Sequence, residues 1–411
     1  MHNYVSLLGI VVIIGLAWLM SSHKNRFPWR TVLAGLCLQF VFAVLILRTS
    51  QGEWVFDRVD DAFVGLLGCV DAGTSFVFGE GFAEHFFAFK VLPTIIFFSA
   101  FMSIFYYYGV MQKVVGMMAI VMQKTLGTSG AETLSAAANV FVGQTEAPLV
   151  IRPYISSMTI SELNAVMVCG FATMAGGVLG ALASMGIDAG HLLSASVISA
   201  PGALVLAKVM QPEVDSPKTL GSVNIDIEDE STNVLESVAV GTVGGLQLAL
   251  NVGAMLIVFL ALIAVLNTIL GWAGGLFGYV GEDGSPIWSL EAGLSYLFYP
   301  LAWLIGIDPG DRGRAAELMG LKMATNEFVA YGRLSEWGLP DSPVQISERS
   351  RAILTYALCG FANFSSIGIQ LGGIGGIAPD RRSDLARLGL RAMLGGTLAG
   401  FMTACIAGQL I

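Results

Sequence analysis

Long apolar stretches constrain the fold of this chain more than any other feature. A helix needs about 20 apolar residues to cross the roughly 30 Å of hydrocarbon in a bilayer. Because lipid offers the backbone no hydrogen-bond partners, such stretches must be helical, and their lack of alternation excludes a membrane β-barrel. We therefore predict an all-α polytopic membrane protein with eight transmembrane helices. They lie at about 3–20, 31–49, 92–110, 163–186, 189–209, 240–271, 350–373 and 388–409.

The composition supports a membrane location. Of the 411 residues, 55% are hydrophobic and only 12% are charged, whereas a soluble domain carries about 25% charged residues. The net charge of −9 and the lack of a basic tract argue against a nucleic-acid partner. The five cysteines and four histidines are scattered without CxxC or HExxH spacing, so neither a disulfide framework nor a zinc site is predicted. No organic cofactor is indicated.

Basic residues gather in two connections, at 23–30 and at 381–391. Cytoplasmic loops carry an excess of Lys and Arg, so both connections are predicted to be cytoplasmic. With eight crossings, this orientation places both termini in the periplasm. The apolar first segment lacks a small-residue cleavage site, which indicates a first span and not a cleaved signal peptide.

One hydrophilic segment divides the chain. Residues 211–238 hold seven acidic residues against Lys218 alone, together with two prolines, and we interpret them as an acidic cytoplasmic linker. The predicted units are N-terminal scaffold spans at 1–110, a first repeat at 111–210, the linker, a scaffold span at 239–280 and a second repeat at 281–411.

Two regions are only moderately apolar and carry a central polar cluster. Residues 128–158 contain Gly-Gln-Thr-Glu-Ala at 143–147, and residues 312–340 contain Ala-Thr-Asn-Glu-Phe at 324–328. Each region is long enough to enter the membrane and turn back as two half-helices. We predict two re-entrant helical hairpins, which are tolerated where protein or a water-filled cavity covers the irregular backbone.

Each predicted hairpin is followed by a span with its own polar break. The first break reads Phe-Ala-Thr-Met-Ala-Gly at 171–176, and the second reads Phe-Ala-Asn-Phe-Ser-Ser at 361–366. With the orientation above, the two hairpins enter from opposite sides of the membrane. Inverted repeats of this kind build secondary transporters, whose sites lie near the midplane at broken helices.

Two glutamates at membrane depth are the strongest candidate site residues. An acidic side chain at the centre of a span costs about 3 kcal/mol on an insertion scale. Glu146 and Glu327 occur at equivalent places of the two repeats, which favours a ligand or coupling role over a helix cap or ion pair. The Asn, Ser and Thr residues clustered at the breaks suit a neutral solute rich in hydroxyl groups.

Four motifs resemble those of the concentrative nucleoside transporters, and the likeness runs from about residue 3 to 409. They are Gly-Gln-Thr-Glu-Ala-Pro-Leu-Val-Ile-Arg-Pro-Tyr at 143–154, Ala-Thr-Asn-Glu-Phe-Val-Ala-Tyr at 324–331, Phe-Ala-Asn-Phe-Ser-Ser-Ile-Gly at 361–368 and Leu-Phe-Tyr-Pro-Leu-Ala-Trp-Leu at 297–304. The resemblance implies a homotrimer in the bilayer of a bacterial inner membrane that imports nucleosides such as uridine, cytidine and adenosine, without enzymatic activity.

The resemblance also implies a site. The base would meet Gln144, Thr145, Glu146 and Val178. The ribose would meet Glu327, Asn363 and Ser366, with Phe361 lining the pocket. One sodium ion would lie between Asn139, the Val142 carbonyl, Thr173 and the Met174 carbonyl; the family often has serine at the position of Thr173.

Three alternatives remain open from the sequence. Proton-coupled relatives carry Gly-Gln-Ser-Glu-Asn at the first tip, and Thr145 and Ala147 of this chain are closer to the sodium-coupled pattern. A membrane-embedded hydrolase could use two carboxylates as acid and base, but no nucleophile–base pair accompanies them. A passive channel is the third alternative, and two re-entrant units with broken spans favour alternating access over it.

Overall fold

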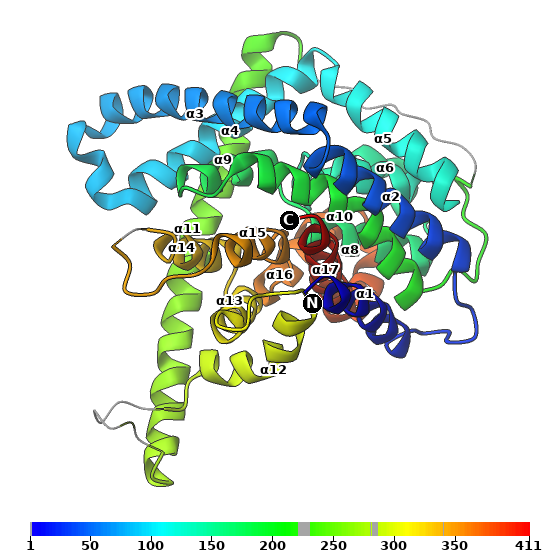
Figure 1. The fold of residues 1–411 in the computed structure, drawn as a ribbon. Coiled ribbons are helices and arrows are strands. Elements are labelled where there is room, and N and C mark those ends of the chain that lie inside the picture. Colours follow the sequence, from blue (N-terminus) through cyan, green and yellow to red (C-terminus); the bar gives the residue numbers. More distant parts are fainter. Residues whose placement is uncertain (1, 221–230, 280, 282–286, 340) are drawn as a thin grey trace.

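The computed structural model describes residues 2–411 except 221–230, 280, 282–286 and 340 (Figure 1). Within these residues every regular element is a helix, which agrees with the predicted all-α class, while the two re-entrant hairpins stay a prediction. The helices of the first half are α1 (His2–Leu19), α2 (Trp29–Leu47), α3 (Ser50–Phe78), α4 (Leu92–Tyr107), α5 (Val110–Leu126), α6 (Gly130–Ala138), α7 (Arg152–Ile155), α8 (Ile160–Ala172), α9 (Gly176–Ser184) and α10 (Ala189–Met210). Those of the second half are α11 (Val234–Leu276), α12 (Leu290–Leu304), α13 (Arg312–Ala324), α14 (Glu327–Glu336), α15 (Glu348–Ala357), α16 (Phe364–Ile377) and α17 (Arg382–Leu410). Short 3-10 or π segments are η1 (Glu80–His85), η2 (Phe87–Val91), η3 (Ala147–Ile151) and η4 (Pro379–Arg381).

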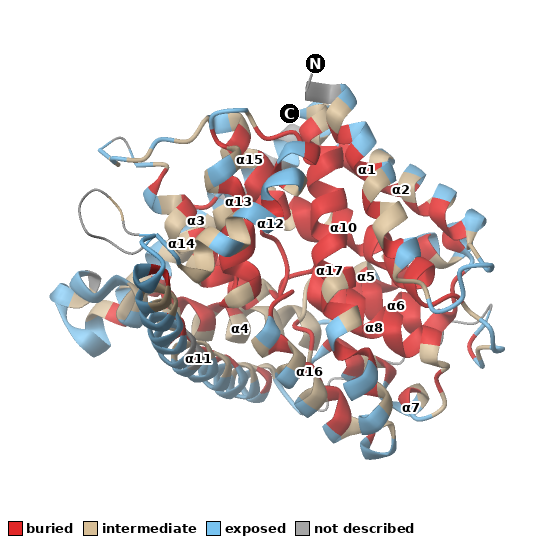
Figure 2. Cartoon of the chain, turned by 90° about the horizontal axis from the view of Figure 1, so that it is seen from below, coloured by how far each residue is buried: buried red, intermediate tan, exposed pale blue. Residues whose placement is uncertain are grey.

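The helices separate into an interior group and a peripheral group. Helices α8, α10 and α17 pack on one another at the centre, and α11 runs along the edge against α4 (Figure 2). In the most apolar part of α10, 89% of the residues are buried, against 6% in α11. A helix that is apolar all round and yet uncovered is suited to lipid contact. The two termini lie side by side, because α1 packs on α17.

The predicted spans all coincide with helices. In the described residues, seven helical segments are long and apolar enough to cross a membrane, and six of them match predicted spans. The predicted spans 3–20 and 350–373 correspond to shorter apolar helices, of which the second is divided between α15 and α16. The count of eight crossings stays a prediction.

Helix α3 is the seventh apolar segment, and the sequence analysis did not anticipate it. It runs unbroken for 29 residues, although no span was predicted between 49 and 92. Four of the five acidic residues of this helix lie in its first twelve residues, whereas 63–78 contains a single charge, Asp71. Scattered charges at its start thus obscured an otherwise apolar helix.

The linker is packed against the protein in its first part. Residues 221–230, which carry four of its acidic residues, lie outside the described part of the chain. Thr219 is buried, and its carbonyl and hydroxyl accept the N–H groups of Gly130 and Ala131 at 2.9 and 3.1 Å. These N–H groups belong to the first turn of α6, where a helix has no partners of its own. The linker therefore caps the first hairpin, which its acidic composition did not predict.

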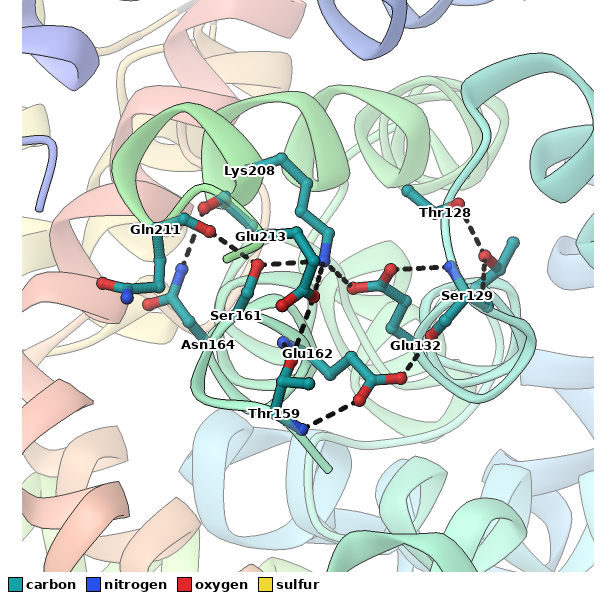
Figure 3. A network of polar contacts seen from close by, with 12 residues as sticks. Thr128, Ser129, Glu132, Thr159, Ser161, Glu162, Asn164, Lys208, Gln211 and Glu213 are labelled. Carbon is teal, nitrogen blue, oxygen red and sulfur yellow. Dashed lines mark hydrogen bonds and ion pairs between the residues drawn. The ribbon is translucent and has the colours of Figure 1, made fainter. Parts of the chain in front are cut away.

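A buried ionic network joins the base of this hairpin to α8 and α10 (Figure 3). The Lys208 ammonium lies 2.6 Å from Glu132 and 3.2 Å from Glu213, and it donates to Ser161 Oγ at 2.9 Å. Glu132 also accepts from the Ser129 N–H at 2.8 Å. A second carboxylate, Glu162, accepts from the Ser129 hydroxyl. One lysine thus connects the start of the first hairpin, the start of the first broken helix and the linker.

Replacing Lys208 by methionine should strongly destabilise the protein, because Glu132 would keep a buried charge without its partner. Breaking a buried pair from one side costs about 3–5 kcal/mol. We expect a clearly lower unfolding midpoint in detergent, followed by tryptophan fluorescence, and partial recovery in the double variant with Glu132→Gln. The exposed Lys113 offers the control Lys113→Met, which should leave the midpoint unchanged. Equal midpoints for the two lysine variants would contradict a structural role of the network.

Candidate functional site

The first hairpin ends in a turn that is bound to the first helix break. Helix α6 stops at Ala138, and the chain turns back into η3 at Ala147. Within the turn, the Gly143 N–H donates to the Glu146 carboxylate at 3.1 Å. The Phe141 carbonyl accepts the Gly176 N–H, the first of helix α9, at 2.9 Å. The tip and the break therefore satisfy each other's backbone groups.

The second hairpin meets the second break through side chains. Lys322 is buried and donates to the Cys359 carbonyl at 2.7 Å. Asn363 caps α16, because its Oδ1 accepts from the Ser366 N–H at 3.0 Å and from the Ser365 hydroxyl at 2.7 Å. Its Nδ2 is thereby directed to Glu327, to which it donates at 3.2 Å.

The two breaks lie against each other at the centre of the molecule. Gly360, between α15 and α16, has φ of +90°. A Cβ at this position would lie 2.4 Å from the Phe171 carbonyl oxygen at the end of α8. Only glycine tolerates both the backbone angle and the contact. The crossing brings residues from the two repeats into one region.

A cavity of about 210 Å³ lies between the two tips, the two breaks and α11. A water molecule takes about 30 Å³ in the liquid, so the space suits a small molecule and exceeds the size of a single ion. All eight side chains predicted to contact substrate line this cavity: Gln144, Thr145, Glu146, Val178, Glu327, Phe361, Asn363 and Ser366. Their contact with a nucleoside stays a prediction.

Polar and apolar side chains both line the cavity. Glu327 is 4% exposed and lies at the first turn of α14, and α16 also begins beside it. Helix N-termini favour negative charge, so this position suits a carboxylate. Glu146 is exposed, and Val178 and Phe361 contribute apolar surface. Such a lining can accept hydrogen bonds from hydroxyl groups and pack against the apolar face of a ring.

The predicted ion ligands lie at or just after the C-termini of α6 and α8. Asn139 and Thr173 are the C-cap residues of α6 and α8. The Asn139 Nδ2 donates to the Ser135 carbonyl at 3.0 Å, while its Oδ1 is buried without a partner among the described residues. The Val142 and Met174 carbonyls accept no backbone hydrogen bond from the described residues. Free oxygens at the negative ends of two helices suit a cation.

Two amide side chains on α11 were missed by the sequence analysis. Gln247 and Asn251 line the cavity, and Gln247 Nε2 donates to Asn251 Oδ1 at 3.0 Å. They are four residues apart in an otherwise apolar stretch, so they share one helix face. That spacing was the available signal, since polar groups in a span usually face the protein interior.

Family comparisons cover almost the whole chain. Residues 191–408 match the family described as "Na+ dependent nucleoside transporter C-terminus". Residues 8–81 match its N-terminal counterpart, and residues 88–189 match a family described as "Nucleoside recognition".

Individual relatives agree with these families. An "Uncharacterized transporter" of Haemophilus influenzae is 47% identical over 99% of this chain and 97% of its own length. "Solute carrier family 28 member 3" of Eptatretus stoutii is 46% identical over 100% of this chain, which spans only 61% of that relative. "Sodium/nucleoside cotransporter 1" of Rattus norvegicus is 44% identical, and the chain spans 64% of it.

Solved structures match over the full chain. CNTnw in an inward-facing substrate-bound state superposes with a TM-score of 0.91 at 42% identity, covering 100% of this chain and 98% of that chain. A CNTnw variant in an outward-facing state gives a TM-score of 0.92 at 42% identity, with the same coverage.

Adding a methyl group at the crossing of the breaks should disrupt the site. Gly360→Ala places a Cβ against backbone in a left-handed conformation, which alone costs about 1–3 kcal/mol. We expect a lower unfolding midpoint for Gly360→Ala. Gly368, on α16, is exposed with no atom near its Cβ position, so Gly368→Ala should leave the midpoint unchanged or slightly raised. A Gly360→Ala protein as stable as Gly368→Ala would contradict the crossing described above.

Proposed function

The chain belongs to the family of Na+-dependent nucleoside transporters, and we propose that it imports nucleosides such as uridine, cytidine and adenosine by symport with sodium. The family is one of transporters and not of enzymes. The observation that carries the proposal is the gathering of residues from both repeats around one cavity. The proposed location is the bacterial inner membrane, with a homotrimer as the assembly and both termini in the periplasm.

In this proposal, Glu327, Asn363 and Ser366 hold the ribose. A carboxylate can accept from two neighbouring hydroxyl groups, and such charge-assisted hydrogen bonds are the stronger kind. The bond from Asn363 to Glu327 supports this role, because it orients the carboxylate. Gln144, Thr145 and Glu146 meet the base, with Val178 and Phe361 against the apolar parts of the substrate.

Sodium is proposed to bind at Asn139, Val142, Thr173 and Met174. Support comes from Asn139 Oδ1, which has no partner in the described part of the chain, and from Asn139 and Thr173 as the C-cap residues of two helices. The ion is transported with the nucleoside and would hold the first tip and the first break in the geometry that the base requires.

Alternating access is proposed as the mechanism, with the two repeats moving against the scaffold. The similarity to CNTnw in both inward- and outward-facing states supports this mechanism. The test is uptake of labelled uridine into proteoliposomes with and without an inward sodium gradient. Accumulation above equilibrium that needs sodium is expected. Accumulation that follows a proton gradient would replace sodium by protons, and simple equilibration would indicate a passive channel.

Replacing Glu327 by glutamine should severely reduce uptake of every nucleoside, since all of them carry the ribose. Loss of a hydrogen bond to a charged group costs about 1.5–3 kcal/mol, or roughly tenfold and more in affinity. The measurement is the KM for uridine, cytidine and adenosine. Glu317→Gln is the matched control on the same hairpin, where the carboxylate pairs with Arg333. Near-normal KM values in Glu327→Gln would remove this residue from the site.

Sodium and nucleoside should bind cooperatively, because both proposed sites share the first tip. Coupling of this kind is typically about 1–3 kcal/mol and acts equally in both directions. Titration of the purified protein with uridine at several sodium concentrations and constant ionic strength should show tighter binding as sodium rises. Thr173→Ala should weaken this dependence, and Thr74→Ala, at a buried threonine of α3 with the same type of intrahelical bond, should not. Affinity that ignores sodium would contradict the ion site.

A further inference from the structure

We propose that Gln370 is a positioning residue that decides which end of the Gln144 side chain faces the base. Gln370 lies on α16, is completely buried, and is not among the residues that line the cavity. It lies two residues beyond the motif at 361–368, so no sequence motif marks it as part of the site. The inference rests on the proposed function and adds to it a cause for base selectivity.

Gln370 connects three elements through one nitrogen atom. Its Nε2 donates to Gln144 Oε1 at the first hairpin tip, at 2.9 Å. The same nitrogen donates to the Met167 carbonyl on α8, at 3.1 Å. Gln370 is thus a direct side-chain link between the second broken helix and the base-binding tip of the first repeat.

The direction of these bonds follows from the Met167 carbonyl. A backbone carbonyl only accepts, so the end of the Gln370 amide that faces it must be the NH₂ group. The Gln144 atom that faces this same NH₂ group must then be the acceptor, Oε1. The other end of Gln144, its own NH₂ group, is left as a donor for the cavity, which Gln144 lines. A backbone carbonyl outside the cavity thereby fixes the polarity of a base contact.

The local packing leaves space for this pair of amides. A Cβ at position 170 on α8 would lie 2.8 Å from Gln370 Nε2 and 3.0 Å from Gln144 Cβ. A side chain at this position would push the two glutamines apart. Because residue 170 is a glycine, the two glutamines can stay in contact, which independently supports a specific role for this contact.

The Gln370 amide is not explained by stability alone. Its Oε1 is buried without a partner among the described residues. An unsatisfied buried acceptor is unfavourable, and a methionine of similar shape would avoid it. The NH₂ group of the amide explains its presence, because it donates the hydrogen bond that holds Gln144.

Binding of uridine, cytidine and adenosine to purified protein tests the proposal. Gln370→Met removes the donor with little change in shape, so ribose contacts should persist and binding should remain. The ratio of the uridine and cytidine dissociation constants should change by about two- to tenfold, the effect of one hydrogen bond. Gln144→Ala should change the same ratio. In the double variant, Gln370→Met should add no further change, because Gln370 acts only through Gln144.

Gln144→Glu tests the direction of the amide without disturbing the core. The new carboxylate can still accept from Gln370, but it presents an acceptor to the base where Gln144 presents a donor. We expect uridine affinity at least as low as in Gln144→Ala. Wild-type affinity and ranking in Gln144→Glu would overturn the proposal, and this variant remains informative if Gln370→Met fails to fold.

A purely structural role for Gln370 has a different signature. Equal losses for all three nucleosides in Gln370→Met, with a lowered unfolding midpoint and an unchanged ranking, would overturn the positioning role alone. Gln39→Met is the control for the loss of a buried structural glutamine. Gln39 is completely buried on α2 and donates to the Ile198 carbonyl. A wild-type protein that binds no nucleoside would overturn the proposed function, and this inference with it.

Discussion

Backbone groups freed by the two helix breaks must find partners inside the protein, because hydrocarbon offers none. The structure meets this requirement by placing the irregular segments against one another. The Gly176 N–H finds the Phe141 carbonyl, and the Cys359 carbonyl finds Lys322. The backbone of Gly360 lies directly on that of Phe171. Tips and breaks from both repeats thereby meet at the centre, and the cavity between them follows from this arrangement.

The directions of the half-helices give the two parts of the site opposite character. Asn139 and Thr173 are the C-cap residues of α6 and α8, and free carbonyl oxygens at these helix ends make the region negative. Helices α14 and α16 begin near Glu327, where free N–H groups make it positive. A cation is favoured at the first place and a carboxylate at the second. The directions of the half-helices are therefore compatible with the proposed ion site and with the proposed hydroxyl-binding role of Glu327.

The sequence predicted most of what lies at the tips and breaks, because polar residues inside apolar stretches are conspicuous. The full set of eight contact residues, which line one cavity, came from the family resemblance, because Val178 and Phe361 carry no polar signal. The sequence did not predict Gln370, whose proposed role depends on a bond to Gln144, 226 residues away in sequence. The same limit applies to Lys208, whose partners come from α6 and the linker. Helix α3 was not predicted because the acidic residues near its N-terminus lower the apolar character of the segment.

The charged groups at the base of the first hairpin and those at the cavity have different partners. At the base of the first hairpin, Lys208 is fully engaged by Glu132 and Glu213, so these charges are satisfied within the protein. At the cavity, Asn363 is the only side chain of the described residues that hydrogen-bonds Glu327, and Glu146 is bonded to the backbone of Gly143. Carboxylates supported by neutral groups keep acceptor capacity for a ligand. The ionic network holds the hairpin in place, whereas the hydrogen bonds to Glu327 and Glu146 leave acceptor capacity on both carboxylates for a ligand.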